Sequence, residues 1–212
     1  MATEFPSKYP AILSPFIDLD LRSQIHDQNF EVAKGAMNGR DLEIAYKLVA
    51  CAKKIAPAIC SLPENQGKEG FVVVFTNRSD SFNLTFQVGR VTDPDEVFLP
   101  GGKLEKYCIF ARLKAQVLKD HPEFISSGQN LALSEDEKLR SPADQEIPSG
   151  AIAFGDYIVS VSAFKNANMD TANAIAIGIG AGLTTIDGAE KIATDPRVSC
   201  NEFIANEDKI IL

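Results

Sequence analysis

The pattern of apolar and polar positions predicts helices and strands along most of the chain. Apolar residues recur at three- and four-residue spacing over residues 41–56 and 103–120, the period of a helix with a buried stripe. Between them, residues 71–75 form a continuous apolar run, and residues 82–88 alternate apolar and polar positions. The polar residues 77–81 separate these two runs, so this region predicts a β-hairpin.

A second strand pair and a third helix are predicted further along. Residues 152–164 supply β-branched and aromatic side chains on both sides of a tight turn. Residues 170–183 repeat small and apolar side chains at helical spacing on nearly every side. We expect Asp41 and Asp170 to be the N-caps of their helices, because a carboxylate there accepts hydrogen bonds from free backbone N–H groups. Residues 122–149 are polar and charged and predict a long loop.

The distribution of apolar side chains predicts self-association. The helix over residues 103–120 carries a second apolar stripe, formed by Ile109, Phe110, Leu113 and Val117. A helix that is apolar on two sides needs a sheet on one side and a second layer or subunit on the other. The N-terminal segment also contains aromatic residues that need a surface to pack on: Phe5, Tyr9, Phe16 and Phe30. We therefore expect a homo-oligomer, either a dimer or a larger assembly.

Length and charge narrow the class of protein. The chain of 212 residues is long enough for one sizeable core, and we divide it into an N-terminal arm (1–39), one domain (40–186) and a C-terminal tail (187–212). Its net charge of −8 argues against nucleic-acid and anionic membrane surfaces, which need clustered Lys and Arg. The sequence lacks an apolar run of about 18 residues and a signal peptide. We expect a cytoplasmic protein.

Few residues are candidates for chemistry. Cys51, Cys60, Cys108 and Cys200 are scattered without a C-x-x-C pair, which predicts neither a metal site nor a disulfide framework. The chain has two histidines, His26 in the arm and His121 near a helix end. Either His121, or His26 reaching over the pocket of a neighbouring subunit, is a ligand for a metal or haem iron, or both have ordinary roles, with His121 exposed to solvent at a helix end. No residue is identified as catalytic.

Three basic residues complete the candidate ligand-binding set. Lys114 lies on a mostly apolar helix, where it either binds an anionic ligand or extends to solvent along the core. Arg78 and Arg90 flank the predicted hairpin. They either join Lys114 in an anion site or are ordinary surface charges.

Three short motifs occur in the order found in a known family. An A-x-x-K-A pattern is present at residues 111–115, the strand Tyr157-Ile-Val-Ser-Val-Ser-Ala follows the long loop, and a D-x-x-x-A helix begins at Asp170. In this order of elements and motifs, residues 41–183 resemble the GlcG/HbpS family, which includes the C-terminal domain of PduO proteins. The resemblance implies a profilin-like α/β (α+β) domain, with an antiparallel sheet flanked by helices.

The resemblance also implies a ligand class. Members of the family form dimers or larger rings and bind haem or cobalamin-related ligands, and some are described as haem-degrading. Three functions stay open at this point. The first is an oligomeric small-molecule-binding protein with haem, a tetrapyrrole or another anionic ligand between the central helix and residues 122–149. The second is an enzyme on the same scaffold, and the third is an assembly module without a ligand.

Overall fold

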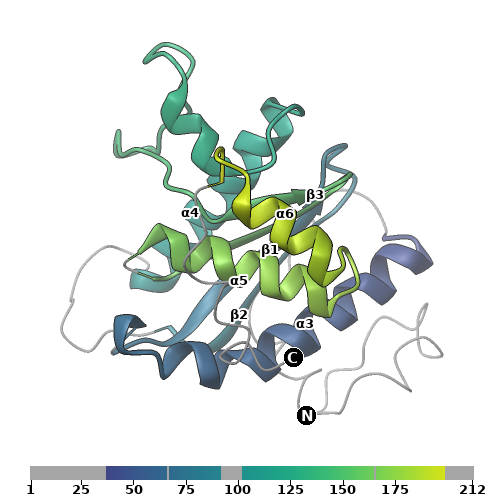
Figure 1. Ribbon diagram of the computed structural model, residues 1–212. Helices are drawn as coiled ribbons and strands as arrows, with labels where there is room; N and C mark the ends of the chain where they lie inside the picture. The colour runs from purple at the N-terminus through teal and green to yellow at the C-terminus, as the bar shows by residue number, and fades with distance from the viewer. Residues whose placement is uncertain (1–36, 66, 92–101, 165, 199–212) are drawn as a thin grey trace.

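The computed structural model describes residues 37–65, 67–91, 102–164 and 166–198. The arm with its four aromatic residues and His26, the end of the tail, and Cys200 lie outside these residues. Within them, the chain forms one α+β unit in which helices flank a four-stranded antiparallel sheet (Figure 1).

Two hairpins form the sheet, as the sequence predicted. The first consists of β1 (Glu69–Asn77) and β2 (Asn83–Arg90), and the second of β3 (Ala151–Phe154) and β4 (Tyr157–Ser162). The two hairpins join through antiparallel pairing of β1 with β4, which gives the strand order β2-β1-β4-β3. The two edge strands are therefore β2 and β3.

Helices pack against both faces of this sheet. One face packs with α3 (Gly39–Cys60), α5 (Ala167–Gly180) and α6 (Ile186–Thr194), and α5 and α6 lie in front of the sheet in Figure 1. The other face packs with α4 (Gly102–Asp120). Both faces of β1 are covered, and this explains its continuous apolar run: alternate residues belong to the two separate core clusters.

The N-caps differ from those predicted. Asn38 caps α3, where its side chain accepts from the Asp41 N–H, and Asn166 caps α5, where its side chain accepts from the Asn168 N–H. Asp41 and Asp170 lie instead in the first turns of these helices, and both are buried. A carboxylate in the first turn still benefits from the helix dipole, but its side chain is free to bond elsewhere.

Both sides of α5 are covered in the single chain, whereas the second apolar side of α4, where a second layer or subunit was predicted, stays partly exposed. Residues 169–178 of α5 are buried without interruption. In α4, Val117 is fully buried, whereas Phe110 and Leu113 are partly exposed and Ile109 is 37% exposed. Charged residues, including Lys106 and Arg112, share this outer side. The described residues place no second layer on this side of α4, so a second subunit stays its predicted cover.

Residues 121–150 are ordered by contacts with β3. Ser126 forms a bridge with Ile152, and the Ala153 N–H donates to the Ile125 carbonyl at 3.0 Å. The segment then forms the 3-10 turn η2 (Ser127–Ala132); another 3-10 turn, η1 (Pro63–Asn65), follows α3. One edge of the sheet is thus covered. No helix in the described residues has the length and apolar character needed to cross a bilayer.

Candidate functional site

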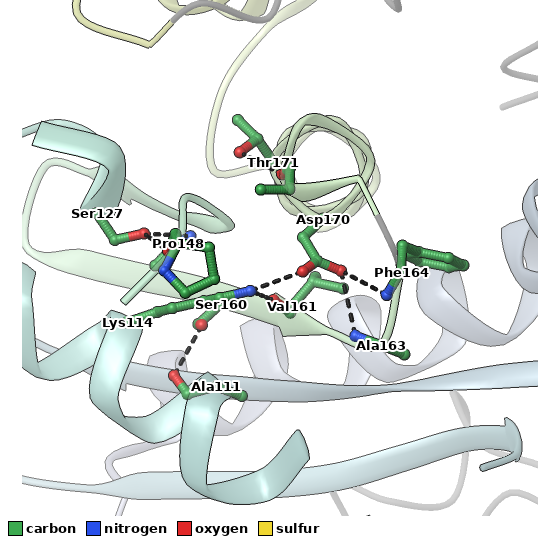
Figure 2. A network of polar contacts seen from close by, with 12 residues as sticks. Ala111, Lys114, Ser127, Pro148, Ser160, Val161, Ala163, Phe164, Asp170 and Thr171 are labelled. Atoms are coloured by element: carbon green, nitrogen blue, oxygen red, sulfur yellow. Dashed lines mark hydrogen bonds and ion pairs between the residues drawn. The ribbon is translucent and has the colours of Figure 1, made fainter. Parts of the chain in front are cut away.

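A buried ion pair links the two layers of helices past one end of the sheet. Lys114 on α4 places its Nζ 2.7 Å from Oδ2 of Asp170 on α5, although these helices cover opposite faces (Figure 2). The Lys114 Nζ also donates to the Val161 carbonyl at 2.9 Å. The Lys114 side chain is fully buried, and that of Asp170 is 4% exposed. The anion that Lys114 binds is therefore a carboxylate of its own chain.

The remaining oxygen of Asp170 holds the segment between β4 and α5. Its Oδ1 accepts hydrogen bonds from the Ala163 and Phe164 N–H groups, each at 3.2 Å. Burial raises the pKa of Asp170, and the Lys114 ammonium and the two N–H donors oppose this effect. A buried carboxylate with an ammonium and two N–H donors has the partners that such a charge requires.

Gly150 provides the space for the ion pair. A Cβ atom at this position would lie 2.6 Å from the Lys114 Nζ, 2.7 Å from the Asp170 Cβ and 2.9 Å from the Val161 oxygen. The φ angle of Gly150 is +135°, which side-chain-bearing residues rarely adopt. Both its conformation and its surroundings therefore require glycine.

The serine hydroxyls near the ion pair and the Cys51 thiol on α3 have structural environments. The Ser160 Oγ donates to the Ala111 carbonyl at 2.8 Å, and the Ser127 Oγ accepts from the Ala151 N–H at 3.1 Å (Figure 2). Both serines are fully buried. Burial raises the pKa of Cys51 to about 11, so its reactive thiolate form is scarce near neutral pH. These groups do not have the access or activation that a nucleophile needs.

Arg78 clamps three segments at the opposite end of β4. Its guanidinium donates to the carbonyls of Gly155 in the β3–β4 turn, Leu118 near the end of α4, and Phe124. The respective distances are 3.2, 2.5 and 2.8 Å. Its planar, multivalent donor geometry suits three converging oxygens better than an ammonium would.

Replacing this guanidinium with an ammonium tests the clamp. We expect Arg78→Lys to lower the free energy of unfolding by on the order of 1–3 kcal/mol, because at least one carbonyl loses a charged donor. Urea denaturation monitored by circular dichroism measures the change. Arg90→Lys is the matched control, because Arg90 is exposed at the far end of β2. Equal stability of the two variants would show that the clamp contributes nothing.

The structure does not bring the three basic candidates into one site. Strand pairing places Val73 opposite Val161, and Arg78 follows Val73 by five residues, so the backbone of Arg78 lies roughly 16 Å along the strands from the Val161 carbonyl that binds the Lys114 ammonium. The backbones of Arg78 and Arg90 lie at opposite ends of the first hairpin, roughly 30 Å apart. An anion site formed jointly by these residues is therefore not assembled.

His121, like Arg90, is a candidate whose side chain stays partly accessible. It follows α4, its side chain is 28% exposed, and its ring stacks on Phe124 with centroids 4.6 Å apart. The Nδ1 atom lies 3.4 Å from Oε1 of Glu123. The pKa of Glu137 is lowered, mainly by a hydrogen bond from Ser134 and to a smaller extent by the nearby imidazole. Within the described residues, no hydrogen bond or ion pair involves the Nε2 atom of His121.

Sequence reasoning missed the partner of Lys114 and the role of Gly150. A local capping role was expected for Asp170, because the sequence shows no signal for a contact between residues 56 positions apart. One indirect signal was available: Lys114 and Asp170 both lie on apolar helices, and a buried Lys and a buried Asp each need an opposite charge. The described residues contain no cluster of His, Cys, Asp or Glu that could hold a metal ion.

Comparisons of this chain with protein-family models, with curated proteins and with solved structures found no match.

Proposed function

We propose that this chain is a homo-oligomeric small-molecule-binding protein of the GlcG/HbpS type, with a ligand site where α4 meets residues 121–150. The observation that carries the proposal is the environment of His121. Stacking on Phe124 and the nearby Glu123 carboxylate orient the imidazole, while no described residue bonds its Nε2 atom. A carboxylate on one ring nitrogen and a free second nitrogen is a common arrangement for a histidine that binds a metal centre.

The three motifs shared with the GlcG/HbpS family contact one another in the structure, which supports the proposed GlcG/HbpS type. Lys114 of the A-x-x-K-A pattern and Asp170 of the D-x-x-x-A pattern form one ion pair. Both also bond the strand motif between them, through the Val161 carbonyl and the Ala163 N–H. Motifs that are distant in sequence therefore serve one structural purpose, which supports a shared origin over a chance match.

Several observations favour binding over catalysis. Lys114, Asp170, Ser127 and Ser160 are buried and bonded within the protein. A catalytic acid, base or nucleophile must reach its substrate, and these side chains are sealed from solvent. The enzyme alternative therefore gains no support from the buried polar residues.

The charges near His121 narrow the ligand class. Glu123 and Glu137 are the acidic neighbours of the imidazole, so this surface disfavours a simple anion and favours a ligand with a cationic metal centre. The iron of haem meets this condition, because it takes a neutral histidine as an axial ligand, and the anionic propionates of haem would point away from the two glutamates. His121 is the one histidine among the described residues, so it is the described residue suited to the role.

Titration with haemin tests the proposal. We expect a saturable Soret shift with the full chain, and an affinity for haemin at least about 10-fold weaker in His121→Ala, because the axial ligand is lost. His26→Ala is the matched control, since it removes the other histidine. An unchanged titration in His121→Ala would contradict the assignment to this residue. The absence of any shift in the full chain would contradict haem binding and favour the assembly alternative.

A further inference from the structure

Asn173 on α5 has a buried amide that lacks a protein partner. Its side chain is fully buried, and within the described residues neither its Oδ1 nor its Nδ2 atom has a hydrogen bond. The other buried asparagines of these residues differ. Asn130 is paired at both ends, because its Nδ2 donates to the Leu139 carbonyl and its Oδ1 accepts from the Leu139 N–H, each at 3.0 Å. Asn65 is paired at its Nδ2 atom. A buried polar group normally has a partner, which is either protein or ordered water.

The position of Asn173 in the sequence places it on the side of α5 that faces α3. Residues three and seven positions apart share one side of a helix, and Ala176 and Gly180 follow Asn173 at these spacings. Both are in contact with Cys51 of α3: its Sγ donates to the Ala176 carbonyl at 3.8 Å, and a Cβ atom added at Gly180 would overlap this Sγ. Helices α3 and α5 pack on the same face of the sheet (Figure 1). Asn173 therefore lies within this layer and not on its outer surface.

The surroundings of Asn173 are apolar and small. Asp170 lies one turn before Asn173, but its two oxygens are bonded to Lys114 and to the backbone of residues 163 and 164. The buried residues that the two helices contribute to this core cluster include many alanines, which are Ala45, Ala52 and Ala56 of α3 and Ala172, Ala174 and Ala176 of α5. Short side chains are compatible with a water-sized molecule beside the amide, whereas the close packing at Gly180 and the full burial of Asn173 disfavour a larger one.

The two ends of the amide specify the chemistry of its partner. The Oδ1 atom needs a donor and the Nδ2 atom needs an acceptor, so a suitable molecule provides both. An anion would satisfy the Nδ2 atom alone, a metal cation would satisfy the Oδ1 atom alone, and either charge would be costly among apolar side chains. Water is uncharged, is both donor and acceptor, and typically forms about three hydrogen bonds when it is buried.

We infer that Asn173 binds an internal water molecule between α5 and α3. The water bonds the amide, and its remaining hydrogen bonds go to backbone carbonyls, because each carbonyl oxygen has two lone pairs. The Cys51 thiol already bonds the Ala176 carbonyl in this way, so a carbonyl on this side of α5 accepts a bond from the direction of α3. The site lies on the opposite face of the sheet from α4 and does not involve His121. It is therefore independent of the proposed ligand and of self-association.

Cross-relaxation between water and the side-chain amides tests the site on the unmodified full chain. We expect NOESY and ROESY cross-peaks of opposite sign between water and the Nδ2 protons of Asn173, which is the signature of a water molecule that stays bound. Asn130 provides the control in the same spectra. Both ends of its amide are bonded to Leu139, so it should not show this pair of cross-peaks.

Three results of this measurement would overturn the inference. Cross-peaks of equal sign at Asn173 would report proton exchange without a bound water. A resolved Asn173 amide without a water cross-peak would show that no water is held there. Cross-peaks from this amide to a polar group of the chain in place of water would show that the protein itself provides the partner.

Replacing the amide with a hydrocarbon of similar size provides a second measurement. Oxygen-17 relaxation dispersion counts the water molecules held inside a protein, and we expect Asn173→Leu to lose about one of them. Asn168→Leu is the matched control, because Asn168 is exposed on the same helix, and this variant should keep the wild-type count. An unchanged count in a folded Asn173→Leu protein would also contradict the inference. If that variant does not fold, the cross-relaxation measurement on the wild-type chain decides.

Discussion

Asp170→Ala is expected to lower the free energy of unfolding by about 3–5 kcal/mol, because it leaves the Lys114 ammonium fully buried without a counter-charge. The Val161 carbonyl would remain as a hydrogen-bond acceptor for this ammonium. The Ala163 and Phe164 N–H groups would lose their acceptor at the same time. A charge and two donors would therefore be left unsatisfied by one substitution.

Guanidinium denaturation measures this loss, and the chain provides a control with the same geometry. Lys47 and Glu43 on α3 also form an ion pair at 2.7 Å, but both side chains are about half exposed. We expect Glu43→Ala to cause no measurable change, because solvent screens an exposed pair. Asp170→Ala and Glu43→Ala with equal stabilities would contradict the importance of burial. The double variant Lys114→Met, Asp170→Leu should recover much of the loss, since no charge then remains buried.

Gly150→Ala is expected to cost on the order of 3 kcal/mol, because an unfavourable φ angle and a steric clash add together. The new methyl group would lie 2.6 Å from the Lys114 Nζ and 2.9 Å from the Val161 oxygen. The Lys114 end is flexible, but its hydrogen bonds to Asp170 and Val161 hold it in place. Relief of the clash would therefore disturb the ion pair itself.

Gly155→Ala separates the two causes. Gly155 lies in the turn at the other end of β3 with a φ of +62°, and a methyl group added there would have no neighbouring atom within 4 Å. The Gly155→Ala substitution therefore has the conformational cost without the clash, and we expect it to lower the free energy of unfolding by about 1 kcal/mol. Thermal and denaturant unfolding of both variants give the comparison. Equal losses would show that the space beside Lys114 is not limiting.

The strands and their pairing within each hairpin were predictable, because each strand has a clear pattern of apolar positions. The alternation over residues 82–88 and the apolar run over residues 71–75 correspond to an edge strand and a strand covered on both faces. The pairing of the two hairpins through β1 and β4 was not predictable, since it depends on contacts between residues 80–90 positions apart. The predicted N-caps were wrong because Asn and Asp are equally good caps and several lie close together.

The candidate site was only partly predictable. The sequence left two roles open for Lys114, binding of an anion or extension to solvent, and it does not distinguish an external anion from an internal carboxylate. The sequence likewise identified Arg78 as a charged residue but did not predict its three carbonyl partners, because every residue has a backbone oxygen and the sequence does not tell which ones come close. His121 was identified because the chain has two histidines. That Phe124 and Glu123 orient its ring is visible only in the fold.

The Lys114–Asp170 pair has a consequence for how the protein unfolds. The helix on one side of the sheet cannot separate from the sheet without breaking the bond to α5 on the other side. Partial opening of one layer therefore leaves the charge of the other layer buried without its partner, which makes such intermediates costly. The domain should lose its structure in a single cooperative step, without a stage in which one helical layer has melted and the other persists.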